Sequence, residues 1–499
     1  MLPDFQRAWA WRLGVLLLLA FPTLLYHRGI ALRFGLRDDY STLREAREEP
    51  EAIRGFCTSQ GRPVYGILLA ASFARLDGID SLPVAREGSA VLLGLICAGV
   101  ALVLDRQLGW PRPHAVVLAG LLAVLPSAQV VVHWGICWPH VLAGVLGVAS
   151  FALAERGRRT AARRGRCFFW GLGAGVLLIG LLTYQSNALF YGVLVAAGFL
   201  APAAGPVADR IRGLLTHALL VGVVLVVAFL ITKALFQVNG FWASPRVTIE
   251  GAWLDKLGWF GRTPLANALA LVVVADDAGR TEPWHHLAAA VVALLLVGAS
   301  ALEWRRAGRR AALAWWAGLL GLMALTYAAS FVAAERWPTY RTIFPLTGVI
   351  GVFLVRAVTS LGSCWPRVGE RLAVLALGAL VGVGGWQARQ TSLRYLATMQ
   401  ADEWRRVEAA AAGVDPAPGR RIYTWLPDEE DSGAALQYCD EFGSQSADCD
   451  WCAKEMLLQV LRRRYPQVGD LAARLHFRSG TAAPAAGSYD TLVDLRLQR

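Results

Sequence analysis

The chain has 499 residues, of which 56% are hydrophobic and 17% are charged, with a formal net charge of +12. A soluble globular protein would carry about 25% charged residues, so an ordinary soluble enzyme is excluded. The positive charge comes from Arg in short loops between apolar blocks, which is typical of membrane proteins and does not indicate nucleic-acid binding. The sequence has no P-loop, GxGxxG or HExxH pattern, which excludes transport driven by a built-in nucleotide domain.

The apolar residues fall in blocks of about 15 to 22 residues, the length that crosses a bilayer as a helix. They predict an all-α polytopic membrane domain over residues 1–388 with about eleven transmembrane helices. We expect the first block to be a retained helix, because no small-residue cleavage site follows it. The expected spans are roughly 9–27, 88–104, 114–131, 138–154, 167–183, 187–202, 214–235, 286–302, 311–332, 342–358 and 372–388.

Two further apolar stretches, 64–76 and 265–275, are only about 11 to 13 residues long, which favours interfacial or re-entrant helices. Loop charge supports this interpretation. If neither stretch crosses and the N-terminus is cytoplasmic, every Arg-dense short loop falls on the cytoplasmic side. If one stretch crosses, the loop with six Arg between 156 and 166 moves outside. We therefore expect a bacterial inner (cytoplasmic) membrane protein, with residues 28–87, 236–285 and 389–499 on the periplasmic side.

The tail, residues 389–499, differs in composition and predicts a small soluble periplasmic α/β domain. Residues 421–426 and 491–497 alternate like strands, and residues 403–412 and 456–464 are typical of helices. The tail also holds Cys439, Cys449 and Cys452. In an oxidising compartment, one disulfide with one spare thiol is the simplest arrangement. The alternative is a metal site that adds His476, although the second CxxC of a typical zinc site is missing.

The first outer loop carries an acidic pair, Asp38 and Asp39, directly after the first span, and Gly61-Arg62-Pro63 opens the first short apolar stretch. Carboxylates beside apolar surface are costly to hold. Adjacent carboxylates also repel, which raises the pKa of one and makes it a better general base. The ordinary structural alternative is a helix N-terminus, where Asp is favoured. The sequence therefore indicates chemistry at the membrane surface.

Two other outer turns, Tyr184-Gln185 and Glu335-Arg336-Trp337-Pro338-Thr339-Tyr340-Arg341, complete the pattern. With the acidic pair and the Gly-Arg-Pro turn, the chain resembles the GT-C superfamily of polytopic glycosyltransferases. It is most similar to the serotype-converting O-antigen glucosyltransferases, which take sugars from polyprenyl-phosphate carriers. The resemblance covers roughly residues 9–345, and the tail contributes nothing to it.

The resemblance implies a glycosyltransferase that moves one sugar from a polyprenyl-phosphate donor, such as undecaprenyl phosphate, at the periplasmic face. The acceptor would be a cell-surface glycan such as the O-antigen of lipopolysaccharide, a glycolipid or a secreted protein. Glucose is the family's default sugar, with arabinofuranose and aminoarabinose as alternatives. The open alternatives for the function are a lipid-linked sugar flippase or transporter and an O-antigen polymerase or ligase. A transporter would be expected to bury ionisable residues near the midplane, and the spans here are almost free of charge.

The expected roles follow from charge and hydrogen bonding. Asp38 is the expected base in an inverting displacement, with Asp39 as a supporting acceptor contact. Because bidentate Arg suits phosphate, the expected donor-phosphate ligands are Arg62, Arg336 and Arg341, with Lys256 and Arg280 behind them. The candidate sugar or acceptor contacts are Tyr40, Tyr184, Gln185, Glu335 and Tyr340. We expect no obligatory metal or other cofactor, because Arg can neutralise the single phosphate of the leaving group.

Overall fold

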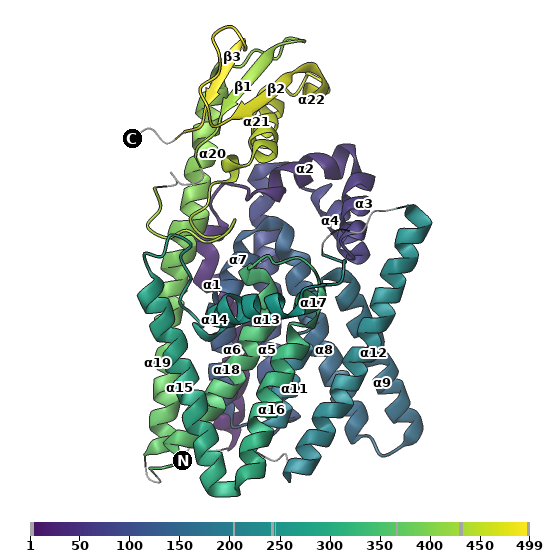
Figure 1. The fold of residues 1–499 in the computed structure, drawn as a ribbon, viewed down its shortest axis with the longest axis vertical. Helices are drawn as coiled ribbons and strands as arrows, with labels where there is room; N and C mark the ends of the chain where they lie inside the picture. The colour runs from purple at the N-terminus through teal and green to yellow at the C-terminus, as the bar shows by residue number, and fades with distance from the viewer. Residues whose placement is uncertain are drawn as a thin grey trace.

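The computed structural model describes residues 4–202, 205–240, 244, 246–365, 368–428 and 433–496. Figure 1 shows a long helical bundle with the N-terminus at one end and a small sheet at the other. Eight helical runs are long and apolar enough to cross a membrane, or up to nine if a bent pair is one span, counted over the described residues. The chain is therefore a multi-pass α-helical membrane protein, as the sequence predicts.

The eight runs include most of the expected spans. They are α1 (Asp4–Ile30), η1 with α5 (Ile79–Ser81, Leu82–Arg106), η2 with α8 (Gly135–Cys137, Trp138–Arg159), α9 (Arg163–Thr183), α12 (Val207–Asn239), α15 (Glu282–Ala307), α18 (Tyr340–Gly362) and the run that begins with α19 (Gly369–Ser392). The bent pair is α6 (Arg112–Val124) and α7 (Pro126–His133), which meet at 56°. Pro126 explains the bend, because proline cannot continue the hydrogen bonding of the preceding helix.

Two expected spans, 187–202 and 311–332, are not single long helices. The first is divided into α10 (Gln185–Ala188) and α11 (Tyr191–Phe199), and the second into α16 (Arg309–Thr326) and α17 (Ala328–Val332). Both segments still lie within the bundle (Figure 1). Gln185 lies beside Arg62 near the tail, whereas Phe199 lines a cavity with Arg106 and Arg158 at the opposite end. Residues 185–199 therefore carry the chain from one end of the bundle to the other.

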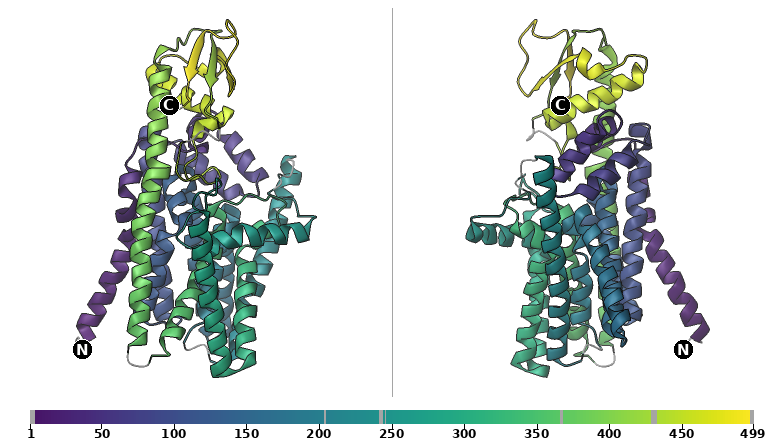
Figure 2. Two further views of the ribbon diagram at one scale, coloured as in Figure 1. Left: turned by 60° about the vertical axis from the view of Figure 1, so that its left-hand side comes forward. Right: turned by 90° about the vertical axis from the view of Figure 1, so that its right-hand side faces the viewer.

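The two short apolar stretches form short helices, as expected. Residues 64–76 form α4 (Pro63–Phe73), and residues 265–275 contain α14 (Pro264–Leu269). In the first outer loop, α4 follows α2 (Asp38–Glu48) and α3 (Pro50–Ser59), and the three helices cover the tail-side end of the bundle. In the second, α13 (Trp253–Arg262) lies across the bundle axis (Figure 2).

The tail is joined to the bundle by continuous helix. The last span continues through a π-helical turn, Leu393–Thr398, into α20 (Met399–Ala410). Three parallel strands then form a sheet in the order β2-β1-β3, from β1 (Arg421–Trp425), β2 (His476–Gly480) and β3 (Thr491–Asp494). The sheet packs against α20 through β3 and against α21 (Asp450–Arg464) through β2, and α22 (Leu471–Arg474) packs on α21. The sequence predicted β1, β3, α20 and α21, and it missed β2 and α22.

The ends of the bundle differ in charge, as the loop pattern predicts. Arg106, Arg158, Arg159 and Arg210 line one cavity at the end that also holds the N-terminus (Figure 1). The first outer loop and the tail lie together at the opposite end. Which end faces the cytoplasm stays a prediction from charge.

Candidate functional site

Asp38 lines a cavity of about 470 Å³ at the tail-side end of the bundle. Its wall comes from segments that are far apart in the chain: α2, the turn before α4, the start of α8, the loop before α13, the start of α18 and the first turns of α21. The charged side chains that share this wall with Asp38 are Glu45, Arg62, Arg246, Arg341, Lys454 and Glu455. The acidic pair, the Gly-Arg-Pro turn and the last residue of the late turn therefore meet at one place.

Asp38 stands at the first residue of α2, among several cations. Burial raises the pKa of its carboxyl group above the ordinary value. The positive charge of Arg341 opposes this effect, whereas the negative charge of Asp440 adds to it. A carboxylate with a raised pKa accepts a proton more readily than an ordinary one, which is the property that a general base needs.

Asp39 has a different environment, although it is the next residue. Its side chain is fully buried, and its oxygens accept hydrogen bonds from the backbone N–H groups of Leu36 (2.9 Å), Gly135 (3.2 Å) and Ile136 (2.8 Å). Burial raises the pKa of Asp39 to about 6 despite these donors. Asp39 thus attaches the first outer loop to the turn after α7, and it is not among the residues that line the Asp38 cavity.

Arg62 is a cavity cation whose side chain contacts an aromatic ring and an amide group. It follows Gly61, whose backbone φ of +76° lies in the region that favours glycine. Its guanidinium lies 4.4 Å from the ring centre of Tyr184, and its Nε donates to Gln185 at 3.4 Å. Among the described residues, no carboxylate lies within ion-pairing distance of it. Burial lowers the pKa of Arg62, so a bound anion would relieve an existing electrostatic cost.

Two other arginines complete the positive wall. Arg341 lies 3.4 Å from Glu441 and 3.7 Å from Asp440, and its guanidinium is 4.1 Å from the ring centre of Trp134. Arg246 donates from Nε to Glu335 at 2.7 Å. Sequence reasoning missed Arg246, because no motif surrounds it and its only signal is its position in the second outer loop.

A second cavity, of about 410 Å³ and largely apolar, adjoins the first. The two cavities share Gln60, Arg62 and Arg246. The apolar wall comes from α12, through Val226 and Phe229, and from the segment 327–337. Because α12 is a span, this cavity joins the face of a membrane helix to the cations around Asp38.

The remaining predicted cations have partners outside the Asp38 cavity. Arg336 donates to Glu250 at 3.1 and 3.2 Å, and Lys256 donates to the carbonyl groups of Ala333 and Glu335 at 2.8 and 2.6 Å. Both contacts hold residues 333–336 in place, and Glu335 in this segment accepts a hydrogen bond from Arg246. Arg280 pairs with Asp276 at 3.3 Å, also outside either cavity.

Some of the predicted aromatic and amide residues contact Arg62, whereas others lie in the core away from the cavities. Tyr184 and Gln185 lie against Arg62, and Gln185 also donates to the carbonyl of Gly61 at 2.5 Å. Tyr40 instead stacks on Trp404, with ring centres 5.6 Å apart. The Tyr340 hydroxyl accepts from the backbone N–H of Ala275 at 2.8 Å. Tyr40 and Tyr340 are therefore core residues that do not line the cavities.

The three tail cysteines are free thiols in this structure, and the disulfide stays a prediction. Cys449 Sγ accepts from Arg37 at 2.7 Å, and Cys452 Sγ lies 3.7 Å from the carbonyl oxygen of Arg37. Cys439 contacts Pro338 instead, because its turn is held by Asp277. The alternative metal set is not assembled either, since the described residues contain no group of three metal ligands.

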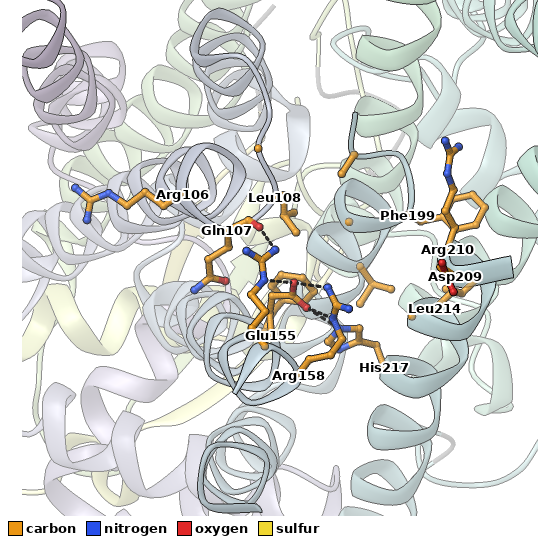
Figure 3. A pocket seen from close by; sticks show the side chains of 17 residues that line it. Arg106, Gln107, Leu108, Glu155, Arg158, Phe199, Asp209, Arg210, Leu214 and His217 are labelled. Carbon is orange, nitrogen blue, oxygen red and sulfur yellow. Dashed lines mark hydrogen bonds and ion pairs between the residues drawn. The ribbon is translucent and has the colours of Figure 1, made fainter. Parts of the chain in front are cut away.

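Another polar cavity, of about 450 Å³, lies at the opposite end of the bundle (Figure 3). Its buried Glu155 accepts from Arg158 at 2.7 and 2.8 Å and from Arg159 at 2.8 Å. His217 lies 3.5 Å from the same carboxylate and 2.6 Å from the Tyr191 hydroxyl. These groups satisfy one another and hold α8, α11 and α12 together, so the cavity has a structural explanation.

No family model matches the chain, and no curated protein sequence matches it. Among solved structures, it resembles the oligosaccharyltransferase of Archaeoglobus fulgidus. The structure of that enzyme, AglB, with an inhibitory peptide and a dolichol-phosphate has a TM-score of 0.45 at 12% identity, covering 85% of this chain and 63% of that chain. The structure with Zn and sulfate has a TM-score of 0.42 at 14% identity, covering 82% of this chain and 60% of that chain. The apo form has a TM-score of 0.43 at 11% identity, covering 83% of this chain and 62% of that chain. The chain thus spans about three fifths of the length of these structures.

Proposed function

We propose that the chain is an integral-membrane glycosyltransferase that moves a single sugar from a polyprenyl-phosphate donor to a hydroxyl group of an acceptor. The observation that carries the proposal is the junction of the two cavities. Asp38, which is half-buried, and three arginines line one cavity, and two of those arginines also line an apolar cavity against a membrane helix. A molecule that combines a lipid chain, a phosphate and a sugar matches this order of surfaces.

The donor fits with its lipid chain along α12 and its phosphate at Arg62 and Arg246. Arg62 is the first choice for the phosphate, because no described carboxylate pairs with it, whereas Arg246 is shared with Glu335. Guanidinium groups suit phosphate because their N–H donors match its oxygens in pairs. The sugar then lies in the Asp38 cavity, and an inner-membrane location with this end in the periplasm follows from the loop charges.

In the proposed reaction, Asp38 accepts the proton of the acceptor hydroxyl as its oxygen attacks the anomeric carbon. The bond between the anomeric carbon and the phosphate oxygen breaks, and its electron pair leaves with the lipid phosphate. Arg62 and Arg246 stabilise the charge on that phosphate. A single displacement inverts the anomeric centre. The step needs no further reactant, and we propose that it needs no metal.

The test is transfer from synthetic polyprenyl-phosphate sugars by the full chain in detergent. Glucose, arabinofuranose and aminoarabinose donors would be compared, with an envelope fraction from cells that lack the chain as acceptor. Because a general base contributes about 10²- to 10⁴-fold, D38N should lose at least about a hundredfold in rate. The control E48Q changes a carboxylate on the same helix that does not line the cavity. Full activity of D38N would contradict the proposal.

Reconstitution of the chain in lipid vesicles separates the transporter alternative. A flippase moves the lipid-linked sugar without consuming it, whereas a transferase releases one polyprenyl phosphate for each sugar transferred. Movement of donor across vesicles with no release of polyprenyl phosphate would favour the transporter.

A further inference from the structure

The tail contains a cavity that the proposed reaction does not use. It has a volume of about 420 Å³ and lies against β1 and β2. Its basic lining residues are Arg421, Lys454, His476 and Arg478, and no described carboxylate lines it. Arg421 is paired with Asp490 at 3.2 Å, whereas Lys454 and Arg478 have no ion pair among the described residues. The cavity is therefore a positively charged site.

Lys454 connects this cavity to the candidate active site, because it lines both. Its ammonium group lies 5.7 Å from the ring centre of Phe477 on β2. One helical turn earlier on α21, Trp451 lines the Asp38 cavity with 43% of its surface exposed. Residues three apart share a helix face. A continuous surface thus runs from Arg478 past Lys454 and Trp451 to Asp38, and we call it the tail track.

The chemistry of the tail track identifies a class of ligand. Unpaired cations attract carboxylate or phosphate groups, and an exposed aromatic side chain at a cavity wall offers an apolar face with a polar edge. A sugar ring presents an apolar C–H face and polar hydroxyl groups, so Trp451 suits it. Two adjacent cavities also provide space for more than one sugar residue. Resting on the proposed function, we propose that the tail track binds an acidic glycan and directs one of its hydroxyl groups toward Asp38.

Binding can be measured without transfer. The full chain in detergent would be titrated with three probes, a galacturonate hexamer, the neutral maltohexaose and a hexaglutamate peptide, by calorimetry at two salt concentrations. The galacturonate hexamer should bind at least about tenfold more tightly than either other probe, and its affinity should fall with salt, because exposed charges are screened. Equal binding of the neutral hexamer would overturn the proposal, and tighter binding of the peptide would replace the glycan with an acidic protein.

Variants test the named residues. K454Q and R478Q should each weaken galacturonate binding by about tenfold, and K454R should restore it, because the positive charge matters. W451A should weaken both sugar probes. The matched control R474Q removes an exposed tail cation that lines neither cavity, and it should bind normally. Normal binding by K454Q and R478Q would overturn the proposal.

The outcome is distinguishable from failure of the proposed function. Binding should persist in D38N, which removes only the base. If the galacturonate hexamer binds as predicted but no sugar is transferred by any form, the proposed function fails and the tail track stands as a glycan site. If transfer occurs, K454Q should raise the KM for an acidic acceptor and leave the KM for the donor unchanged; an unchanged acceptor KM would overturn the proposal.

Discussion

At the scale of single residues, two neighbouring carboxylates have different environments. Asp38 faces a cavity lined by arginines, whereas Asp39 is held by three backbone N–H groups from two segments. Gly135 shows how close this contact is, because a Cβ added there would lie 2.9 Å from an Asp39 oxygen. One residue of the pair is therefore available for chemistry, and the other fixes the position of the first.

Replacing each Asp by Asn should distinguish the two residues, because the two variants should differ in their free energy of unfolding. In D39N, one oxygen becomes an NH₂ group that faces a backbone N–H, so we expect a loss of about 2–4 kcal/mol. In D38N, no such bond is lost. The raised pKa of Asp38 means that its ionised form costs folding free energy above that pKa, so removing the charge should leave stability unchanged or higher. Thermal unfolding of both variants in detergent would check this, and a larger loss in D38N would contradict it.

The pH dependence of transfer follows from the same carboxyl group. Burial raises the pKa of Asp38, and only the ionised form can accept a proton. The rate should therefore rise with pH through this raised pKa and then level off. The residual rate of D38N should lack this acid limb. An identical limb in D38N and in the wild type would assign it to another group.

At the scale of elements, the turn between α3 and α4 positions Arg62, the proposed phosphate ligand. Gly61 has a positive φ, and a Cβ there would lie 3.0 Å from Val247 and 3.3 Å from the Gln185 amide. G61A should therefore cost about 1 kcal/mol or more and displace Arg62. We expect a raised donor KM and a lower kcat in the transfer assay. The matched control G78A has a positive φ but open space around it, so it should affect stability alone.

Charge removal should also distinguish the arginines. R62Q should lower kcat/KM for the donor by about tenfold to a hundredfold, because a cation with no internal carboxylate partner is lost from the cavity. R336Q should have a smaller effect, because Arg336 pairs with Glu250 outside both cavities. Steady-state kinetics with varied donor would measure both. A larger loss in R336Q would move the phosphate site toward the late turn.

At the scale of the whole molecule, the tail forms part of the site. Arg37, directly before Asp38, has a backbone φ of 40° and is held by Asp448 at 3.0 Å. The tail also supplies Glu455 to Arg44 at 2.9 Å and Glu441 to Arg341 at 3.4 Å. Among the described residues, Asp448 is the one carboxylate that pairs with Arg37, whereas Arg44 also pairs with Glu45, Glu48 and Glu49, and Arg341 also pairs with Asp440.

D448N should loosen this contact. Because the Arg37 side chain is largely buried, loss of its partner should cost about 3 kcal/mol. Hydrogen exchange should increase in residues 37–48 and 446–464. D494N, which breaks an exposed pair with Arg496 within the tail, is the control. Equal exchange in both variants would show that Asp448 does not hold the tail on α2.

The sequence predicted the features that depend on local pattern. Apolar block length indicated most spans, and length together with loop charge identified the short stretches before Phe73 and Leu269. The topology predicted from loop charge also placed Asp38, Arg62 and Arg341 at the same end of the bundle. The sequence could not show that Asp39 binds the backbone at Gly135, or that Arg246 joins the cavity, because those contacts link residues distant in the chain. Hydropathy also gave no warning of the break between α10 and α11.

The most direct test of the central claim is the release of polyprenyl phosphate by the wild type and by D38N, measured in detergent with the preferred donor. The account predicts one polyprenyl phosphate released for each sugar transferred by the wild type. It predicts a loss of at least about a hundredfold in D38N, with unfolding behaviour like that of the wild type. Normal release by a stable D38N protein would contradict it.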